Sequence, residues 1–197
     1  MKTKTIELFD FSELSESAKA KVLQEQRDIN TDYDWYKWSL EDWERDLESM
    51  GFDDVNISFS GFWSQGDGAS FTSGSIDIEK FLTAQKAKGR FKAILKAIKA
   101  NKAEFITSID RIDHHYSHEY TVRAYVEYNS LEDKFTPNQD QANELESFLT
   151  DTVRTLSRKI YRELEKEHEH LTTDAAIIDT IEANEYTFTA SGKMKNI

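Results

Sequence analysis

The sequence predicts an α+β fold in which an antiparallel sheet, built from two hairpins plus an edge strand, has helices packed on one face. Two observations support this prediction. In several long segments apolar residues recur every three or four positions, as in amphipathic helices, whereas in others they alternate with polar residues, as in half-buried strands. These segments follow one another with a single proline in the whole chain and no low-complexity linker. We therefore expect one globular domain over residues 1–197.

The first half of the chain is predicted to form a short strand, two helices and a hairpin, at residues 3–9, 15–28, 33–50, 55–60 and 71–78. Ser15 is suited to cap the first helix, because its hydroxyl can accept a backbone N–H of the first turn. The second helix carries an apolar stripe, and Gly51 follows as its C-terminal stop. Beyond Gly51 the apolar period changes to two, which indicates two antiparallel strands.

The second half is predicted to form an amphipathic helix, a second hairpin, a long helix and a final strand, at residues 80–102, 104–112, 119–128, 136–170 and 186–190. Thr136 and Pro137 are typical of the first positions of a helix, and the apolar stripe that follows them is regular over many turns. Thr173 begins a shorter helix before the final strand.

The chain is acidic, with 37 Asp and Glu residues against 25 Lys and Arg residues and a formal net charge of −12. Such a surface repels a phosphate backbone and argues against broad binding to nucleic acid. The absence of cysteine excludes disulfides, thiolate metal sites and thiol catalysis. No stretch resembles a secretory signal or a membrane span, so we expect a cytoplasmic protein without a membrane partner and leave its oligomeric state open.

One basic segment stands out against this acidic background, because residues 80–102 contain eight Lys and Arg residues and no Asp or Glu. If the segment is one helix, four of its lysines form a ridge opposite the apolar stripe and could bind phosphates: Lys88, Lys92, Lys96 and Lys99. The alternative is that this lysine ridge is solvated or offsets neighbouring acidic residues.

The most unusual segment is the decapeptide, residues 62–71, which lies between the strands of the first hairpin. Its two internal glycines allow close approach of a ligand or another backbone. The residues with recognition chemistry are Phe62, Trp63, Ser64, Gln65, Asp67, Ser70 and Phe71. Alternatively, the segment is a wide hairpin loop whose aromatic residues pack in the core and whose Ser64 and Asp67 satisfy turn amides.

The second hairpin is expected to turn at residues 114–118, here called the histidine turn, which contains His114, His115, Tyr116 and His118. Histidines with nearby carboxylates suggest a metal site. Adjacent residues of a hairpin point to opposite faces, however, so these histidines do not converge easily. We therefore predict no bound metal and no other cofactor, and place His115, Tyr116 and His118 on a surface beside the decapeptide.

Three patches, residues 62–71, 115–120 and 183–188, together resemble a group of small uncharacterised bacteriophage proteins that carry the loop Phe-Trp-Ser-Gln-Gly-Asp-Gly-Ala-Ser-Phe. The resemblance implies a phage accessory protein in the cytoplasm of an infected host cell, where many such proteins bind and inhibit a host factor. It assigns no catalytic residue.

The main hypothesis is a non-enzymatic binding protein that engages and inhibits a host protein, such as a defence factor, through the decapeptide and the histidine turn. A first alternative is a nucleotide or nucleic-acid binding protein, in which Trp63 stacks on a base and the lysine ridge contacts phosphates. A second is a metal-dependent hydrolase built on Asp67, Asp113, His114 and His118.

Overall fold

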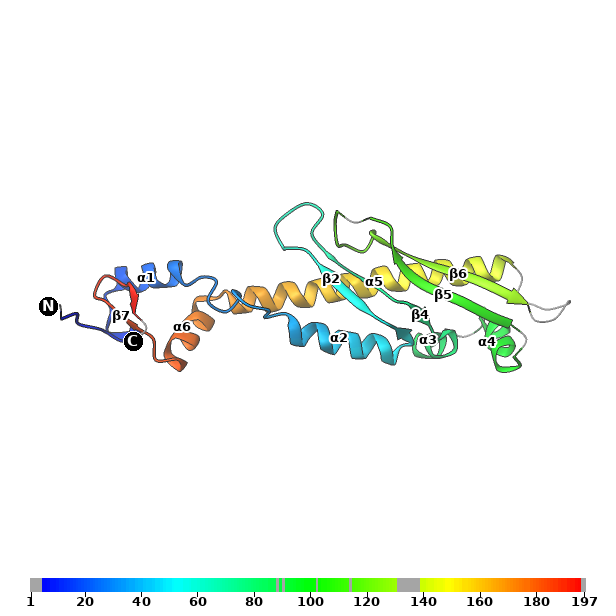
Figure 1. The fold of residues 1–197 in the computed structure, drawn as a ribbon, viewed down its shortest axis with the longest axis horizontal. Coiled ribbons are helices and arrows are strands. Elements are labelled where there is room, and N and C mark those ends of the chain that lie inside the picture. The colour runs from blue at the N-terminus through cyan, green and yellow to red at the C-terminus, as the bar shows by residue number, and fades with distance from the viewer. Residues whose placement is uncertain are drawn as a thin grey trace, which may run out of the picture. The chain divides into compact units, whose positions relative to one another are not determined.

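The computed structural model describes residues 5–87, 89, 91–101, 103–113, 115–130 and 139–195. It confirms the α+β class, with helices and antiparallel strand pairs along the chain (Figure 1). The contacts divide the chain into a terminal unit, Met1–Lys37 with Glu165–Ile197, and a central unit, Trp38–Leu164. The expectation of one domain remains a prediction. Within the described ranges, no helix is long and apolar enough to cross a membrane.

The terminal unit contains η1 (Phe11–Glu13), α1 (Glu16–Glu25), α6 (Asp174–Ala183), β7 (Thr187–Phe188) and β8 (Met194–Lys195). As predicted, Ser15 caps α1 and Thr173 caps α6, each hydroxyl accepting a backbone N–H three residues ahead. The sequence predicted a strand at residues 3–9. In the structure, Phe9 forms one antiparallel bridge with Phe188 at the end of this range. The apolar core of this unit consists of Phe11, Leu14, Ala18, Val22, Ile177, Ile181 and Phe188.

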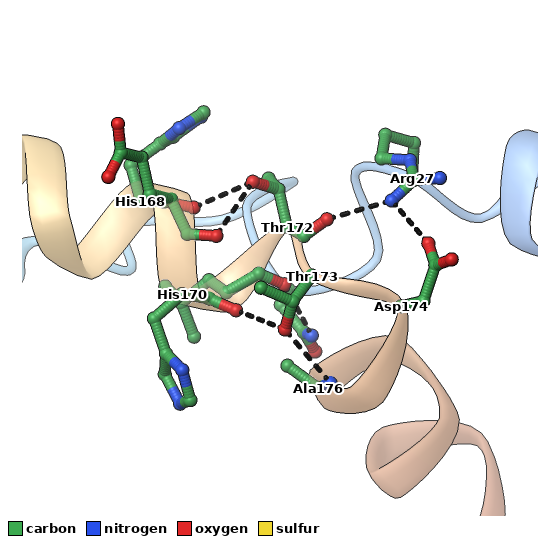
Figure 2. Close-up of polar contacts among 10 residues, drawn as sticks. Arg27, His168, His170, Thr172, Thr173, Asp174 and Ala176 are labelled. Carbon is green, nitrogen blue, oxygen red and sulfur yellow. Dashed lines mark hydrogen bonds and ion pairs between the residues drawn. The ribbon is translucent and has the colours of Figure 1, made fainter.

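The corner that leads into α6 is held by side chains that bind backbone carbonyls (Figure 2). Arg27 donates to the Thr172 carbonyl oxygen and to Asp174 Oδ1, both at 2.8 Å. The buried Asn30 donates to the Leu171 carbonyl oxygen at 3.0 Å. These bonds satisfy the carbonyl groups left without helical partners where a helix ends.

The elements that begin in the central part of the chain are α2 (Lys37–Ser49), β1 (Phe52–Asp53), β2 (Asn56–Phe59), β3 (Ala69–Thr72), β4 (Ser75–Ile76), α3 (Ile78–Ala84), α4 (Lys92–Lys99), β5 (Ala103–Arg111), β6 (Val122–Ser130) and α5 (Gln139–Leu171). The second predicted helix therefore begins later than residue 33. Residues 136–138, the predicted start of the long helix, lie outside the described residues.

Both predicted hairpins are present, because β2 pairs with β3 and β5 pairs with β6, antiparallel in each case. Inward-facing residues lie opposite one another in the register, such as Ile57 with Phe71 and Ile109 with Ala124. An antiparallel bridge between Ser73 and Ile109 connects the two hairpins. The predicted sheet is thus formed of two-stranded pairs, and the strand expected at its edge, β7, pairs instead with β8 in the terminal unit.

The prediction of one continuous helix over residues 80–102 is wrong. Lys86 and Gly89 have positive φ angles of 51° and 89°, and this left-handed backbone ends α3 and separates it from α4. The apolar spacing continued across the break, which is why periodicity alone suggested a single element.

The core of the central unit lies between the hairpins and helices α3, α4 and α5. The Phe52 ring contacts Phe71 at 5.3 Å and Phe81 at 5.7 Å between centroids. Phe148 of α5 continues this aromatic cluster, at 5.6 Å from Phe81 and 5.2 Å from Phe91. The cluster links strands β1 and β3 to helices α3 and α5, and its packed rings give the hairpins a rigid support.

Candidate functional site

The decapeptide and the histidine turn lie side by side, although about fifty residues of chain separate them. Figure 1 shows the β2–β3 and β5–β6 connections next to each other, beyond the ends of their strands. A Cβ atom added at Gly66 would lie 2.8 Å from the Tyr116 ring, and one added at Gly68 would lie 2.5 Å from the His118 Cβ atom. The two glycines therefore allow a contact that a side chain would block.

Asp67 holds the decapeptide in its conformation. Its Oδ2 atom accepts hydrogen bonds from the backbone N–H of Trp63 at 2.8 Å and of Ser64 at 2.7 Å. In addition, the Asp67 N–H donates to the Ser64 carbonyl oxygen at 3.1 Å. The Asp67 carboxylate thus accepts hydrogen bonds from backbone N–H groups of the turn, as the alternative interpretation of the decapeptide expects. Its charge therefore stabilises the loop.

The aromatic residues of the decapeptide take different positions. Phe62 is half-buried and packs on Phe59 and on Tyr161 of α5, with ring centroids 6.0 and 5.6 Å apart. Trp63 is 80% exposed, and Ser64 and Gln65 beside it are also exposed. Phe62 therefore anchors the loop to the protein while its neighbours face solvent.

Residues 68–71 of the decapeptide are buried, and two of them are predicted site residues. Phe71 is buried against Phe52, and Ser70 is buried with its hydroxyl accepting from Thr121 Oγ1 at 3.3 Å. Both belong to β3 and face the protein. They support the loop but are not placed to contact a partner, so we leave them out of the surface defined below.

The histidine turn is built around a row of aromatic rings. Tyr116 stacks on His118 at 6.2 Å, and His118 contacts Tyr120 at 6.0 Å, between ring centroids. His118 Nδ1 accepts the Tyr120 N–H at 3.1 Å, which fixes the orientation of the ring. His115 is exposed, with its ring 6.3 Å from Tyr116.

We define the tip surface by six exposed side chains of these two loops: Trp63, Ser64, Gln65, His115, Tyr116 and Tyr120. Tyr116 is 50% exposed and Tyr120 is 57% exposed. Tyr120 was missing from the predicted site residues, although it belongs to the sequence patch at residues 115–120. Its ring also lies 5.1 Å below the guanidinium carbon of Arg154, on α5, which no local sequence signal indicates.

The metal-site hypothesis rests partly on His114, which lies outside the described residues. Of the residues that the structure describes, no three histidine or carboxylate side chains are grouped closely enough to hold a metal ion. Asp67 is engaged with backbone N–H groups, and His118 Nδ1 is engaged with Tyr120. The hydrolase alternative gains no support from this geometry.

The described lysines of the ridge do not adjoin the tip surface. Lys88 lies outside the described residues, and the three other lysines of the ridge lie on α4. Figure 1 shows α4 well away from the β2–β3 connection. Lys99 Nζ lies 3.1 Å from Glu79 Oε1, an ion pair within the protein. Trp63 and the three described lysines of the ridge therefore do not lie together in one site.

Comparison with known proteins identifies a family for most of the chain. The model of a domain of unknown function, DUF8835, matches residues 35–174. The chain belongs to the DUF8835 family. Both loops of the tip surface lie within the matched region of this DUF8835 protein, whereas residues 183–188 lie outside it. No curated protein and no solved structure matches the chain.

Proposed function

We propose that this DUF8835 protein is a non-enzymatic binding protein that engages a partner protein through the tip surface. In the phage context suggested by the resemblance of three sequence patches, the partner is a host protein, such as a defence factor, that the binding inhibits. The observation that carries the proposal is the juxtaposition of two loops that expose Trp63, Tyr116 and Tyr120. Tyrosine and tryptophan are enriched in protein interfaces and dominate their binding energy.

The contacts within the two loops also favour binding, because the described residues make them without a partner. Asp67 fixes the backbone at Trp63, Phe62 anchors the loop on α5, and the His118 bond to the Tyr120 N–H fixes the second loop. Ordering a flexible loop on binding costs affinity, so a preformed aromatic surface binds more tightly than a mobile one.

The test is capture of a host protein by the tagged DUF8835 protein, followed by calorimetry with the captured protein. Trp63→Ala and Gln65→Ala should keep the fold, because both side chains are exposed. Loss of Trp63 should weaken binding at least about tenfold, since a central aromatic anchor is worth about 2 kcal/mol or more.

Trp38→Ala is the matched control, because Trp38 is 74% exposed but lies on α2 rather than on the tip surface. It should bind the partner as tightly as the unmodified protein. Equal affinities for Trp63→Ala and the unmodified protein would show that recognition takes place elsewhere on the molecule.

A further inference from the structure

A groove lies beside the tip surface, where α5 meets the β5–β6 hairpin. It has a volume of about 400 Å³, and its walls carry Ile112, Arg123, Glu146, Asp151 and Arg154. The groove is continuous with the tip surface through Tyr120, whose ring the Arg154 guanidinium covers. Arg154, which lines the groove, is therefore in contact with a residue of the tip surface.

The two arginines of the groove differ in the hydrogen bonds that their guanidinium groups make within the protein. Arg123 Nη2 donates to Glu146 Oε1 at 3.0 Å, within hydrogen-bonding distance. Arg154 Nη1 lies 3.8 Å from Asp151 Oδ1, which is too long for a hydrogen bond. Arg154 Nε is buried and has no hydrogen-bond partner within the described part of the chain. The Tyr120 ring nevertheless orients this guanidinium.

The Arg154 side chain is 35% exposed and lies 3.8 Å from Asp151, so its charge is only weakly paired within the groove. Because Arg154 Nε has no accessible surface, an external acceptor meets the outer N–H groups of the guanidinium. We propose that Arg154 binds a carboxylate, supplied by an Asp or Glu side chain of the partner protein. This proposal rests on the proposed function, because the carboxylate belongs to the partner protein that the proposed function requires. The two carboxylate oxygens match two parallel N–H groups of arginine.

The charges and shape of the groove favour a carboxylate over a phosphate group. Arg123 and Arg154 are balanced by Glu146 and Asp151, so the groove has no excess positive charge for a dianion. A singly charged carboxylate is repelled less by the two resident acids. Ile112 adds an apolar wall that can contact the methylene groups of a glutamate side chain.

The experiment titrates isotopically labelled DUF8835 protein with glutamate capped at both ends, and follows the Arg154 Nε–H and Tyr120 backbone N–H resonances. Capped glutamine, which is uncharged, and inorganic phosphate are titrated in parallel. The protein variants are Arg154→Lys, which keeps the charge but loses the paired N–H groups, and Arg158→Lys. Arg158 is the matched control, because it lies one turn further along α5 and contacts Thr155 rather than the groove.

Capped glutamate should give shifts that grow with its concentration and an affinity weaker than about millimolar, because one partly exposed ion pair contributes only about 1 kcal/mol. The Tyr120 shift should persist in Arg158→Lys and disappear in Arg154→Lys, and capped glutamine should give none. An equal response to glutamine, tighter binding of phosphate, a response that survives in Arg154→Lys, or no response at all would overturn the carboxylate site.

The titration uses no partner protein, so its outcome is separate from that of the capture experiment. A response to glutamate together with full partner binding by Trp63→Ala would support the carboxylate site and overturn the proposed function. No response to glutamate, together with loss of partner binding by Trp63→Ala, would overturn the carboxylate site and support the proposed function.

Discussion

Gly68 lies directly against His118, so close that an added Cβ atom would come within 2.5 Å of the His118 Cβ atom and 2.8 Å of its Cα atom. Such distances are far shorter than a carbon–carbon contact tolerates. Gly66 makes a similar approach to the Tyr116 ring and has a φ angle of 100°, which favours glycine. The tip surface therefore depends on two residues without side chains.

Gly68→Ala is predicted to separate the decapeptide from the histidine turn. The clash involves the His118 backbone, which cannot move without distorting the turn, so the free energy of unfolding should fall by about 1–3 kcal/mol. Urea denaturation measures the loss. Gly61→Ala is the control, because its added Cβ atom would meet only Asp67 Oδ2, at an ordinary distance of 3.4 Å. Equal stability of the two variants would contradict the contact.

Tyr36 should titrate at a higher pH than an ordinary tyrosine. Its hydroxyl donates to Asp34 Oδ1 at 3.1 Å, and this hydrogen bond, followed by the charge of Asp34 and by burial, raises the pKa of Tyr36. The folded protein therefore holds the phenol proton more tightly than the unfolded chain. The resulting stabilisation is fully present below the unfolded pKa of about 10 and is lost as the pH rises through the folded value.

Asp34→Asn is expected to lower the pKa of Tyr36 toward its usual range, since the amide carries no charge. Ultraviolet difference absorbance follows the phenolate as the pH is raised. Asp32→Asn removes the same charge from a neighbouring exposed residue and should leave the titration nearly unchanged. If the two variants titrate alike, the hydrogen bond to Asp34 is not the cause of the shift.

Local patterns were sufficient to predict the hairpins and the caps of α1 and α6, Ser15 and Thr173. The alternation that placed Ile57 and Phe71 inward is the same alternation that sets their register in the β2–β3 pair. The same observation could have shown that Phe71 is buried rather than available to a partner. The break between α3 and α4 was not predictable from spacing, because Lys86 adopts a left-handed conformation that its residue type seldom takes.

The decapeptide and the histidine turn were predicted to be neighbouring loops, but the contacts that join them to each other and to α5 were not predicted. The contact of Gly68 with His118, and the stacking of Arg154 on Tyr120, join residues far apart in the sequence. Such contacts depend on how the hairpins and α5 pack, which residue periodicity does not determine. The role of Asp67 was also not predictable from the sequence. A carboxylate between two glycines can bind either a ligand or the backbone N–H groups of its own loop. The hydrogen bonds show that Asp67 binds the N–H groups of the loop.

The lysines of α4 are predicted not to bind nucleic acid at physiological salt. Lys99 is paired with Glu79, and the chain as a whole carries a net charge of −12, which repels phosphates. Fluorescence anisotropy with labelled RNA and duplex DNA, at two salt concentrations, tests this expectation. Binding that falls steeply with salt and is lost when Lys92 and Lys96 are changed to Glu would contradict it, because that dependence is typical of phosphate contacts.

Asp67→Ala is predicted to loosen the decapeptide while leaving the rest of the fold intact. The carboxylate accepts the Trp63 and Ser64 N–H groups at 2.8 and 2.7 Å, so both amides should exchange with solvent faster in the variant. The loss of unfolding free energy should be about 1 kcal/mol, because these bonds are charge-assisted but lie in an exposed loop. Hydrogen exchange followed by nuclear magnetic resonance measures both amides individually.

Asp113→Ala provides the matched control for Asp67→Ala, because Asp113 Oδ1 accepts the His115 N–H at 2.8 Å in the neighbouring turn. It should accelerate exchange at His115 and leave Trp63 and Ser64 protected. Unchanged exchange at Trp63 and Ser64 in Asp67→Ala would mean that the Phe62 anchor on Tyr161 alone holds the loop. In that case Asp67 would remain available to a partner, and its substitution should weaken binding without any change in loop order.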